Sequence, residues 1–112
     1  MQTYQHYING QFIDPKAGVW FDTENPYTGE VWAKIPRGDA DDVDRAVAAA
    51  KAAFDGVWGQ TGPTQRGKLL VKLAEIIERE AVRLGEIEVR DNGKLIAEMG
   101  AQTKYLAEWY RY

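Results

Sequence analysis

The side chains of this sequence that could do chemistry are few and scattered. His6 is the only histidine and there is no cysteine, which excludes thiol catalysis and disulfides within the chain. We expect the acidic pairs Asp41–Asp42 and Glu78/Glu80 to be solvated helix faces rather than acid–base dyads. His6 is expected to be a surface strand residue, and no cluster of His, Asp and Glu has metal-ligand spacing. The sequence also lacks a Walker loop, a GxGxxG fingerprint and the HExxH and GxSxG motifs, so these residues alone do not assemble an active site.

The first third of the chain is patterned for strands. Asn9-Gly10 lies between apolar and aromatic residues, which is typical of a type I′ hairpin turn. This predicts a hairpin over residues 4–13. Further extended segments are expected over residues 19–23 and 31–35, separated by the turn Asn25–Gly29, in which proline presets φ and glycine tolerates positive φ.

The remainder of the chain is patterned for helices. Asp39 can cap the first of them, because its carboxylate can accept from free N–H groups. A second run begins at Pro63 and carries large aliphatic side chains at steps of three and four, the spacing of one helix face, which needs a partner surface. The apolar phase weakens around residue 80, so we expect a break or kink near Glu80. The expected helices cover residues 40–55, 63–79, 81–91 and 95–112, and the aliphatic stripe is Leu69, Leu70, Leu73, Ile76 and Ile77.

Length and composition limit which classes of protein this chain can belong to. A chain of 112 residues, 45% hydrophobic and 28% charged, is expected to form one globular domain. No apolar run approaches the roughly 18 residues of a membrane span, and the N-terminus does not resemble a signal peptide. The net charge of −3, without a basic block, does not favour nucleic-acid binding. We therefore expect no membrane and no nucleic-acid partner, and the lack of cysteine fits a cytoplasmic protein.

Several motifs together resemble the N-terminal portion of the aldehyde dehydrogenase superfamily. Each is weak alone, but their order and spacing match the family from end to end of the chain. Leu95 stands where many members have proline, which affects the expected start of the last helix and not the resemblance. The motifs are YINGQF at 7–12, NPYTGE at 25–30, DVDRAVAAAKAAF at 42–54, Trp58, RGKLLVKLAEIIE at 66–78 and DNGK at 91–94.

The resemblance implies a fold and a chemistry. The fold would be an α+β fragment, mostly helical with an N-terminal β-hairpin and a third strand, over residues 1–112. It would form part of the α/β Rossmann-type cofactor-binding domain, with the catalytic domain absent. The family oxidises aldehydes to carboxylic acids with NAD or NADP, using a cysteine nucleophile, a glutamate base and an oxyanion-hole asparagine. None of these residues lies in this chain, so no catalytic or cofactor-binding residue is assigned here and no cofactor is expected on the chain alone.

The resemblance also implies two sites. Asp91 would hold a monovalent cation, Na⁺ or K⁺, together with the backbone carbonyls of Thr23 and Glu24, because hard cations prefer oxygen ligands. Alternatively, Asp91 only organises the turn at Asn92-Gly93 by side-chain to backbone hydrogen bonds. The last helix would border the substrate entrance, although packing is the commoner role of helical aromatics. The candidate lining residues are Gln102, Tyr105 and Trp109.

Two functions stay open from the sequence. The first is a structural part of a parent oxidoreductase, in which the partners are the remainder of the chain, an aldehyde substrate and further copies in a homo-oligomer. This chain alone would then be inactive. The second is a stand-alone, non-catalytic helical module that self-associates to bury its apolar stripes.

Overall fold

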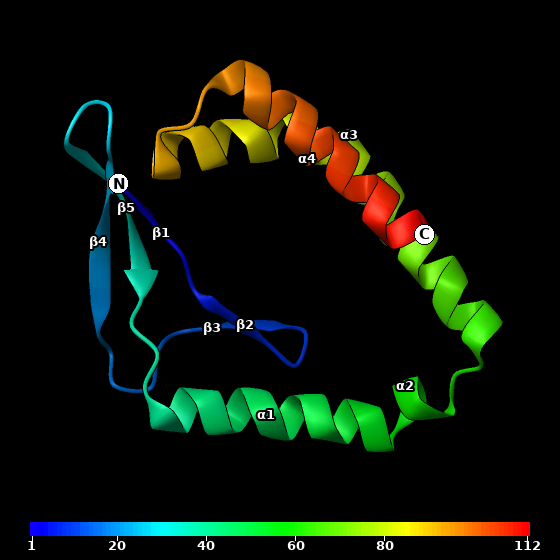
Figure 1. Ribbon diagram of the computed structural model, residues 1–112. Coiled ribbons are helices and arrows are strands. Elements are labelled where there is room, and N and C mark those ends of the chain that lie inside the picture. The colour runs from blue at the N-terminus through cyan, green and yellow to red at the C-terminus, as the bar shows by residue number, and fades with distance from the viewer. The chain divides into compact units, whose positions relative to one another are not determined.

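The computed structural model describes all residues from Met1 to Tyr112, and it divides the chain into two compact units. The first unit contains residues 1–24 and 30–60, and the second contains residues 25–29 and 61–112. Length alone predicts one domain, but the contacts within the chain gather in these two units, which are described separately. Mostly helical structure with a few strands, as expected from the sequence, is confirmed (Figure 1). None of the helices combines the length and the apolar character needed to cross a membrane.

The strands lie in the first unit, except for Asn25 at the end of β4. Strand β1 (Gln2–Thr3), β5 (Glu30–Pro36) and β4 (Trp20–Asn25) form one sheet in that order. Strand β1 pairs with β5 in parallel, which brings Gln2 opposite Ala33, and Ala33 is fully buried. Strand β1 is not predicted by the sequence, because two residues are too few to show an alternating hydrophobic pattern and the strand forms only by pairing with β5.

The predicted hairpin is confirmed over β2 (His6–Ile8) and β3 (Gln11–Ile13), in which Tyr7 faces Phe12. Asn9 and Gly10 have φ angles of 54° and 75°. Positive φ at both central residues is what a type I′ turn requires, and Asn-Gly is the pair that adopts it most readily.

Helix α1 (Ala40–Asp55) has the predicted bounds and begins with a capping box. The Asp39 carboxylate accepts a hydrogen bond from the Asp42 amide at 3.0 Å, and the Asp42 carboxylate accepts one from the Asp39 amide at 3.3 Å. The reciprocal pair satisfies two N–H groups that would otherwise lack a partner at the start of the helix. A single short helical turn, α2 (Val57–Gln60), follows and was not predicted.

The second unit is a pair of helices, α3 (Pro63–Asn92) and α4 (Ile96–Arg111), which lie side by side (Figure 1). A break near Glu80 is not found, because α3 is continuous over 30 residues, and the alternative of a kink there stays a prediction. The apolar phase weakens there because the buried face is made of small residues rather than large ones. The buried residues of the pair are Ala74, Ala81, Gly85, Met99, Thr103 and Ala107.

Small residues allow the two backbones to approach each other closely. A Cβ atom at Gly85 would lie 3.3 Å from the Thr103 hydroxyl, so α4 occupies the space that a side chain would need. The large aliphatic side chains of α3, in contrast, remain partly exposed to solvent. Leu69, Leu73 and Ile76 retain 40%, 39% and 46% of their surface in solvent.

Candidate functional site

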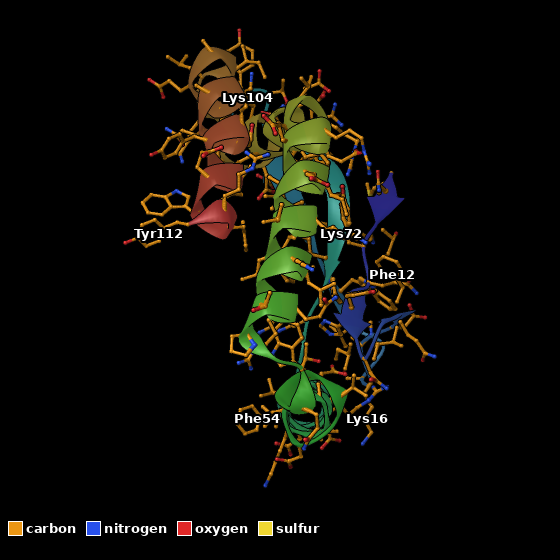
Figure 2. All side chains as sticks on the ribbon, turned by 90° about the vertical axis from the view of Figure 1, so that its right-hand side faces the viewer. Phe12, Lys16, Phe54, Lys72, Lys104 and Tyr112 are labelled. Carbon is orange, nitrogen blue, oxygen red and sulfur yellow. The ribbon has the colours of Figure 1, made fainter.

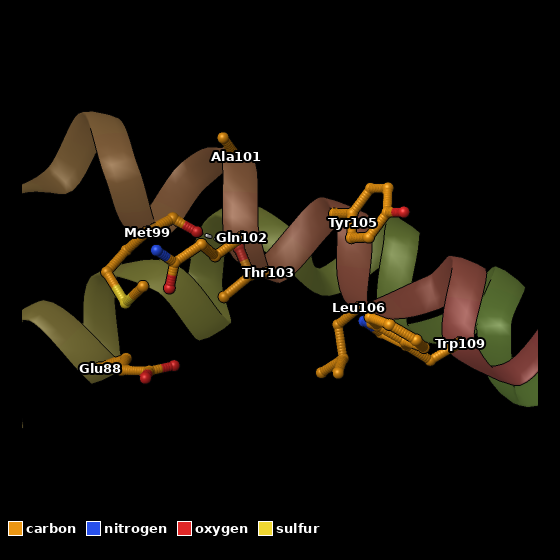
Figure 3. A pocket seen from close by; sticks show the side chains of 8 residues that line it. All are labelled: Glu88, Met99, Ala101, Gln102, Thr103, Tyr105, Leu106 and Trp109. Atoms are coloured by element: carbon orange, nitrogen blue, oxygen red, sulfur yellow. Dashed lines mark hydrogen bonds between the residues drawn. The ribbon is translucent and has the colours of Figure 1, made fainter.

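A hollow in the second unit lies along α4 and contains all three predicted entrance residues. Gln102, Tyr105 and Trp109 line it together with Met99 and Leu106, while Glu88 is the one contribution from α3 (Figure 3). The hollow has a volume of about 710 Å³. Tyr105 and Trp109 meet edge to face, with ring centroids 6.0 Å apart and planes at 88°. Aromatic walls with few polar groups are typical of sites for small organic molecules.

Thr103 lines this hollow and connects the two helices by hydrogen bonds. Its hydroxyl lies 2.6 Å from the Met99 carbonyl oxygen on its own helix and 3.0 Å from the Ala81 carbonyl oxygen on α3. The hydroxyl is buried and can donate only one proton, so the two carbonyls share it. This contact fixes the distance between the helices directly beneath the lining side chains.

Sequence reasoning assigned Met99 and Leu106 to the last helix without placing them in a site. A signal was present, since residues 99, 102, 106 and 109 follow helical steps of three and four and therefore share one face. Glu88 could not be found in this way, because it lies on another helix. Its carboxylate accepts from the Asn92 side chain at 3.3 Å and lies 3.9 Å from the Lys94 ammonium group.

A second candidate site is the corner that ends α3. Gly93 adopts a left-handed conformation with φ of 75°, and its amide donates to the Val89 carbonyl at 2.9 Å, which caps the helix. Asn92 organises the following turn, since its side-chain oxygen accepts from the Lys94 amide at 2.9 Å. The corner packs against the turn at Asn25–Gly29, where a Cβ atom at Gly93 would lie only 2.8 Å from Pro26. Only glycine fits this conformation and this contact together.

The residues predicted for the cation site belong to different units. Thr23 and Glu24 lie in β4 of the first unit, and Asp91 lies in the last turn of α3 in the second. No group of three His, Asp or Glu side chains is arranged to hold a metal ion. A cation site built from one carboxylate and backbone carbonyls is a different donor set, and it stays a prediction.

The acidic pair Asp41–Asp42 was expected to be solvated, and this is wrong for Asp42. Its side chain is 3% exposed, and both carboxylate oxygens accept from the Lys16 amide, at 3.1 and 3.3 Å. Burial by itself raises the pKa of Asp42, but hydrogen bonds from the Lys16 and Asp39 amides and the charges of His6 and Arg45 outweigh it and lower the pKa. Asp41 is the solvated member, paired with the Lys16 ammonium group at 2.6 Å.

One ion pair joins the two helices of the second unit. The Arg111 guanidinium lies 2.6 Å from Glu78 on α3, and it also pairs with Glu108 on its own helix. The hydrogen bond and the charge of Arg111 lower the pKa of Glu78. Glu80 also has a lowered pKa because of hydrogen bonds from Arg83 and Arg79, so neither acid of the pair Glu78/Glu80 is a candidate proton donor at neutral pH.

Comparison with known proteins decides the family. The model of the aldehyde dehydrogenase family matches residues 12–112 of this chain. The chain belongs to the aldehyde dehydrogenase family. It is 51% identical to (Z)-2-((N-methylformamido)methylene)-5-hydroxybutyrolactone dehydrogenase of Acinetobacter baylyi, over all of this chain and 23% of that protein. It is 39% identical to aldehyde dehydrogenase family 2 member B4, a mitochondrial protein of Arabidopsis thaliana, over 94% of this chain and 20% of that protein.

Solved aldehyde dehydrogenase structures have the same fold in this region. The NAD-dependent enzyme from Sinorhizobium meliloti superimposes with a TM-score of 0.94 and 35% identity, over 98% of this chain and 22% of that chain. The NAD⁺ complex of the Bacillus cereus enzyme has a TM-score of 0.94 and 35% identity, over 98% of this chain and 23% of that one. The chain therefore corresponds to the N-terminal part of the NAD-binding region of an aldehyde dehydrogenase and spans less than a quarter of the length of these relatives.

Proposed function

We propose that this chain is the N-terminal segment of an enzyme that oxidises an aldehyde to a carboxylic acid with NAD or NADP as hydride acceptor. The observation that supports this most strongly is the family match over residues 12–112, accompanied by a shared fold. Within the enzyme, the segment has a structural role. It completes the cofactor-binding domain, while the cysteine nucleophile, the glutamate base and the oxyanion-hole asparagine come from sequence outside this chain.

The cofactor contacts also fall outside the segment. The chain contains no glycine-rich phosphate-binding loop. The NAD⁺ complex of the B. cereus relative supports a dinucleotide for the parent enzyme, and the choice between NAD and NADP rests on residues elsewhere.

The inactivity of the isolated segment provides a direct test. Incubation of the 112-residue chain with NAD⁺ or NADP⁺ and a simple aldehyde should produce no reduced cofactor, while the parent enzyme under the same conditions turns over. Turnover by the segment alone would contradict this assignment of the chemistry. A parent reading frame without a cysteine-bearing catalytic domain would contradict the dehydrogenase assignment itself.

The hollow along α4 is proposed to border the substrate entrance through Gln102, Tyr105 and Trp109. Tyr105 and Trp109 are 61% and 68% exposed, so their rings are available to a neighbouring molecule. Removing the Trp109 ring is expected to raise KM for a bulky aromatic aldehyde more than KM for acetaldehyde. The matched control is Val82→Ala, which removes an exposed apolar side chain outside the hollow and should change neither KM. Equal effects of Trp109→Ala on both substrates would count against a lining role.

The relative from A. baylyi is named for a substituted 5-hydroxybutyrolactone. A substrate of that kind is a candidate for the parent enzyme, because aromatic and aliphatic walls accept an uncharged organic molecule. A comparison of kcat/KM for this lactone with kcat/KM for a simple aliphatic aldehyde would test the candidate directly.

A cation site at Asp91, with the backbone carbonyls of Thr23 and Glu24, is part of the same proposal. In the parent enzyme, replacing choline chloride by NaCl or KCl at equal ionic strength should raise the melting temperature, and Asp91→Asn should reduce that rise. Glu86→Gln on the same helix is the control for the loss of one negative charge. A cation effect that Asp91→Asn leaves unchanged would contradict this site.

Self-association of the isolated segment is the second candidate function, and the open aliphatic stripe of α3 favours it. Leu69, Leu70 and Ile76 remain 40–46% exposed, and Phe54 of the first unit, labelled in Figure 2, is 70% exposed. Exposed apolar surface of this kind drives association in water. Sedimentation of the 112-residue chain should therefore show oligomers, whereas a compact monomer would contradict the need for a partner. In the parent enzyme, the remainder of the chain would cover these faces, and further copies would form a homo-oligomer.

A further inference from the structure

The sequence contains two Asn-Gly pairs, Asn9-Gly10 and Asn92-Gly93, and the structure places them in different surroundings. An Asn-Gly pair can react with itself. The backbone nitrogen of the glycine attacks the side-chain carbonyl carbon of the asparagine, and glycine favours this attack because it has no side chain to hinder the approach. The reaction therefore depends on whether that nitrogen and that side chain are free to meet.

The pair Asn9-Gly10 forms the exposed turn of the β2–β3 hairpin. The Gly10 amide donates to no backbone carbonyl. Open space surrounds it, since no atom beyond the adjoining residues lies within 4 Å of the position that a Cβ atom on Gly10 would occupy. No backbone hydrogen bond of this amide has to break before its nitrogen approaches the Asn9 side chain.

The pair Asn92-Gly93, in contrast, is held by hydrogen bonds at each group that the reaction needs. The Gly93 amide donates to the Val89 carbonyl at 2.9 Å. The Asn92 side-chain oxygen accepts from the Lys94 amide at 2.9 Å, and its side-chain nitrogen donates to Glu88 at 3.3 Å. These bonds must open, and the last turn of α3 must unwind, before the glycine nitrogen can attack.

We propose that Asn9 is a site of spontaneous deamidation and that the fold protects Asn92 from the same reaction. The Gly10 nitrogen gives up its proton to water and forms a bond to Asn9 Cγ, while the side-chain nitrogen takes up a proton and leaves as ammonia. Water then opens the resulting succinimide ring. Cleavage of the bond from the nitrogen to Cγ gives aspartate, and cleavage of the bond from the nitrogen to the backbone carbonyl carbon gives isoaspartate. Water replaces ammonia overall, and nothing is oxidised or reduced.

The two products should affect the hairpin differently. Asp-Gly also favours a type I′ turn, so the aspartate product retains the turn. In the isoaspartate product the main chain runs through the side-chain carbon, which lengthens the turn by one backbone carbon. The length of a hairpin turn fixes the register of its strands, so isoaspartate should disrupt the pairing of Tyr7 with Phe12.

Peptide mapping by mass spectrometry tests the proposal in the full-length protein, incubated at mildly alkaline pH below its melting temperature. The conversion of each asparagine side chain to a carboxylate is followed over time. Asn9 should convert roughly tenfold faster than Asn92 or more, the rate factor for one backbone hydrogen bond that must break first. Asn25 is the internal control, because the nitrogen of the following Pro26 carries no proton to lose.

The same incubation in urea separates the effect of the fold from that of the sequence. Glycine follows both Asn9 and Asn92, so the two should convert at similar rates in the denatured chain. An equal preference for Asn9 in urea would assign it to the sequence and overturn the role of the fold. Conversion of Asn92 in the folded protein as fast as that of Asn9 would also overturn the proposal, as would an Asn9 that converts only in urea.

Hydrogen exchange of a peptide that spans residues 4–13 tests the effect on the hairpin. Its protection should fall as isoaspartate accumulates in the incubated protein. Freshly purified Asn9→Asp carries the same new charge on an ordinary backbone and should keep the protection of the wild type. An equal loss of protection in Asn9→Asp would assign the effect to charge and contradict the role of the lengthened turn.

Discussion

The two units of this chain are held together in different ways. In the second unit, small residues let α3 and α4 approach until Thr103 on one helix shares its hydroxyl proton with a carbonyl on the other. In the first unit, a buried carboxylate, Asp42, gathers the backbone amides of a loop and of a helix start, while the hairpin leaves a hollow against the helix. Close packing is insensitive to pH, whereas a buried charge is not, so the units should respond differently to the same perturbation.

Removal of the largest buried side chain of the second unit should have the largest effect. Met99 is 1% exposed, and Met99→Ala should lower the free energy of unfolding by about 2–5 kcal/mol, because a cavity replaces its packing contacts. Val82→Ala is the control, since Val82 on α3 is 74% exposed and truncation of its side chain should change stability by less than about 0.5 kcal/mol. Urea unfolding of both variants measures the difference. Similar costs for the two substitutions would contradict a core centred on Met99.

Loss of the Thr103 hydroxyl between the helices should have the second-largest effect on stability. Thr103→Val keeps the shape of the side chain but removes the donor to Ala81 and Met99, which should cost about 1 kcal/mol or slightly more. Thr103→Ser keeps the hydroxyl and separates the hydrogen bond from the loss of a methyl group. Calorimetry measures the melting temperature of both variants. If Thr103→Ser is less stable than Thr103→Val, the contribution of Thr103 comes from packing and not from its hydrogen bond.

The capping box of the first unit should contribute about as much as this hydrogen bond. Asp39→Ala removes the side-chain acceptor at the start of α1 and should lower stability by about 1 kcal/mol. Asp44→Ala, in the same helix and on its exposed surface, is the control for loss of a carboxylate. If the two variants have the same melting temperature, the cap makes no measurable contribution to stability.

The smallest effect is expected from the surface ion pair between the helices of the second unit. Because Arg111 lowers the pKa of Glu78 in the folded chain, the pair stabilises the unit above the unfolded pKa of Glu78, and this stabilisation is lost as pH falls through the lowered folded value. Glu78→Gln should therefore lower the urea midpoint slightly at neutral pH and leave it unchanged in strong acid. Glu75→Gln provides the matched control on α3. A difference between Glu78→Gln and wild type that persists in strong acid would contradict the pair.

Local features of the first unit were predictable because adjacent residues encode them. Asn9-Gly10 predicts a turn with two positive φ angles and Asp39 predicts the start of α1, and both are found in the structure. These preferences arise from steric limits on the backbone and from hydrogen bonds that reach only a few residues along the chain. They do not depend on which surface the element later contacts.

The candidate site was predictable in part. The family resemblance pointed to Gln102, Tyr105 and Trp109, and the structure brings these three residues into one hollow. It also adds Glu88 from the neighbouring helix, which no pattern within one helix can indicate. The predicted cation ligands Thr23, Glu24 and Asp91 are divided between the two units, and that site stays a prediction.

The sequence by itself determined where the turns, the caps and most of the elements lie, together with the family to which they belong. Only the tertiary structure decided which side chains are buried. The large aliphatics of α3 predicted a core, but Ala81 and Gly85 form it because α4 needs small residues for close approach. Asp42 looked like a solvated acid, yet it is buried and accepts from the backbone amide of Lys16, which lies far from it in the sequence. Burial depends on the partner surface, and that surface is assembled from segments that do not adjoin in the sequence.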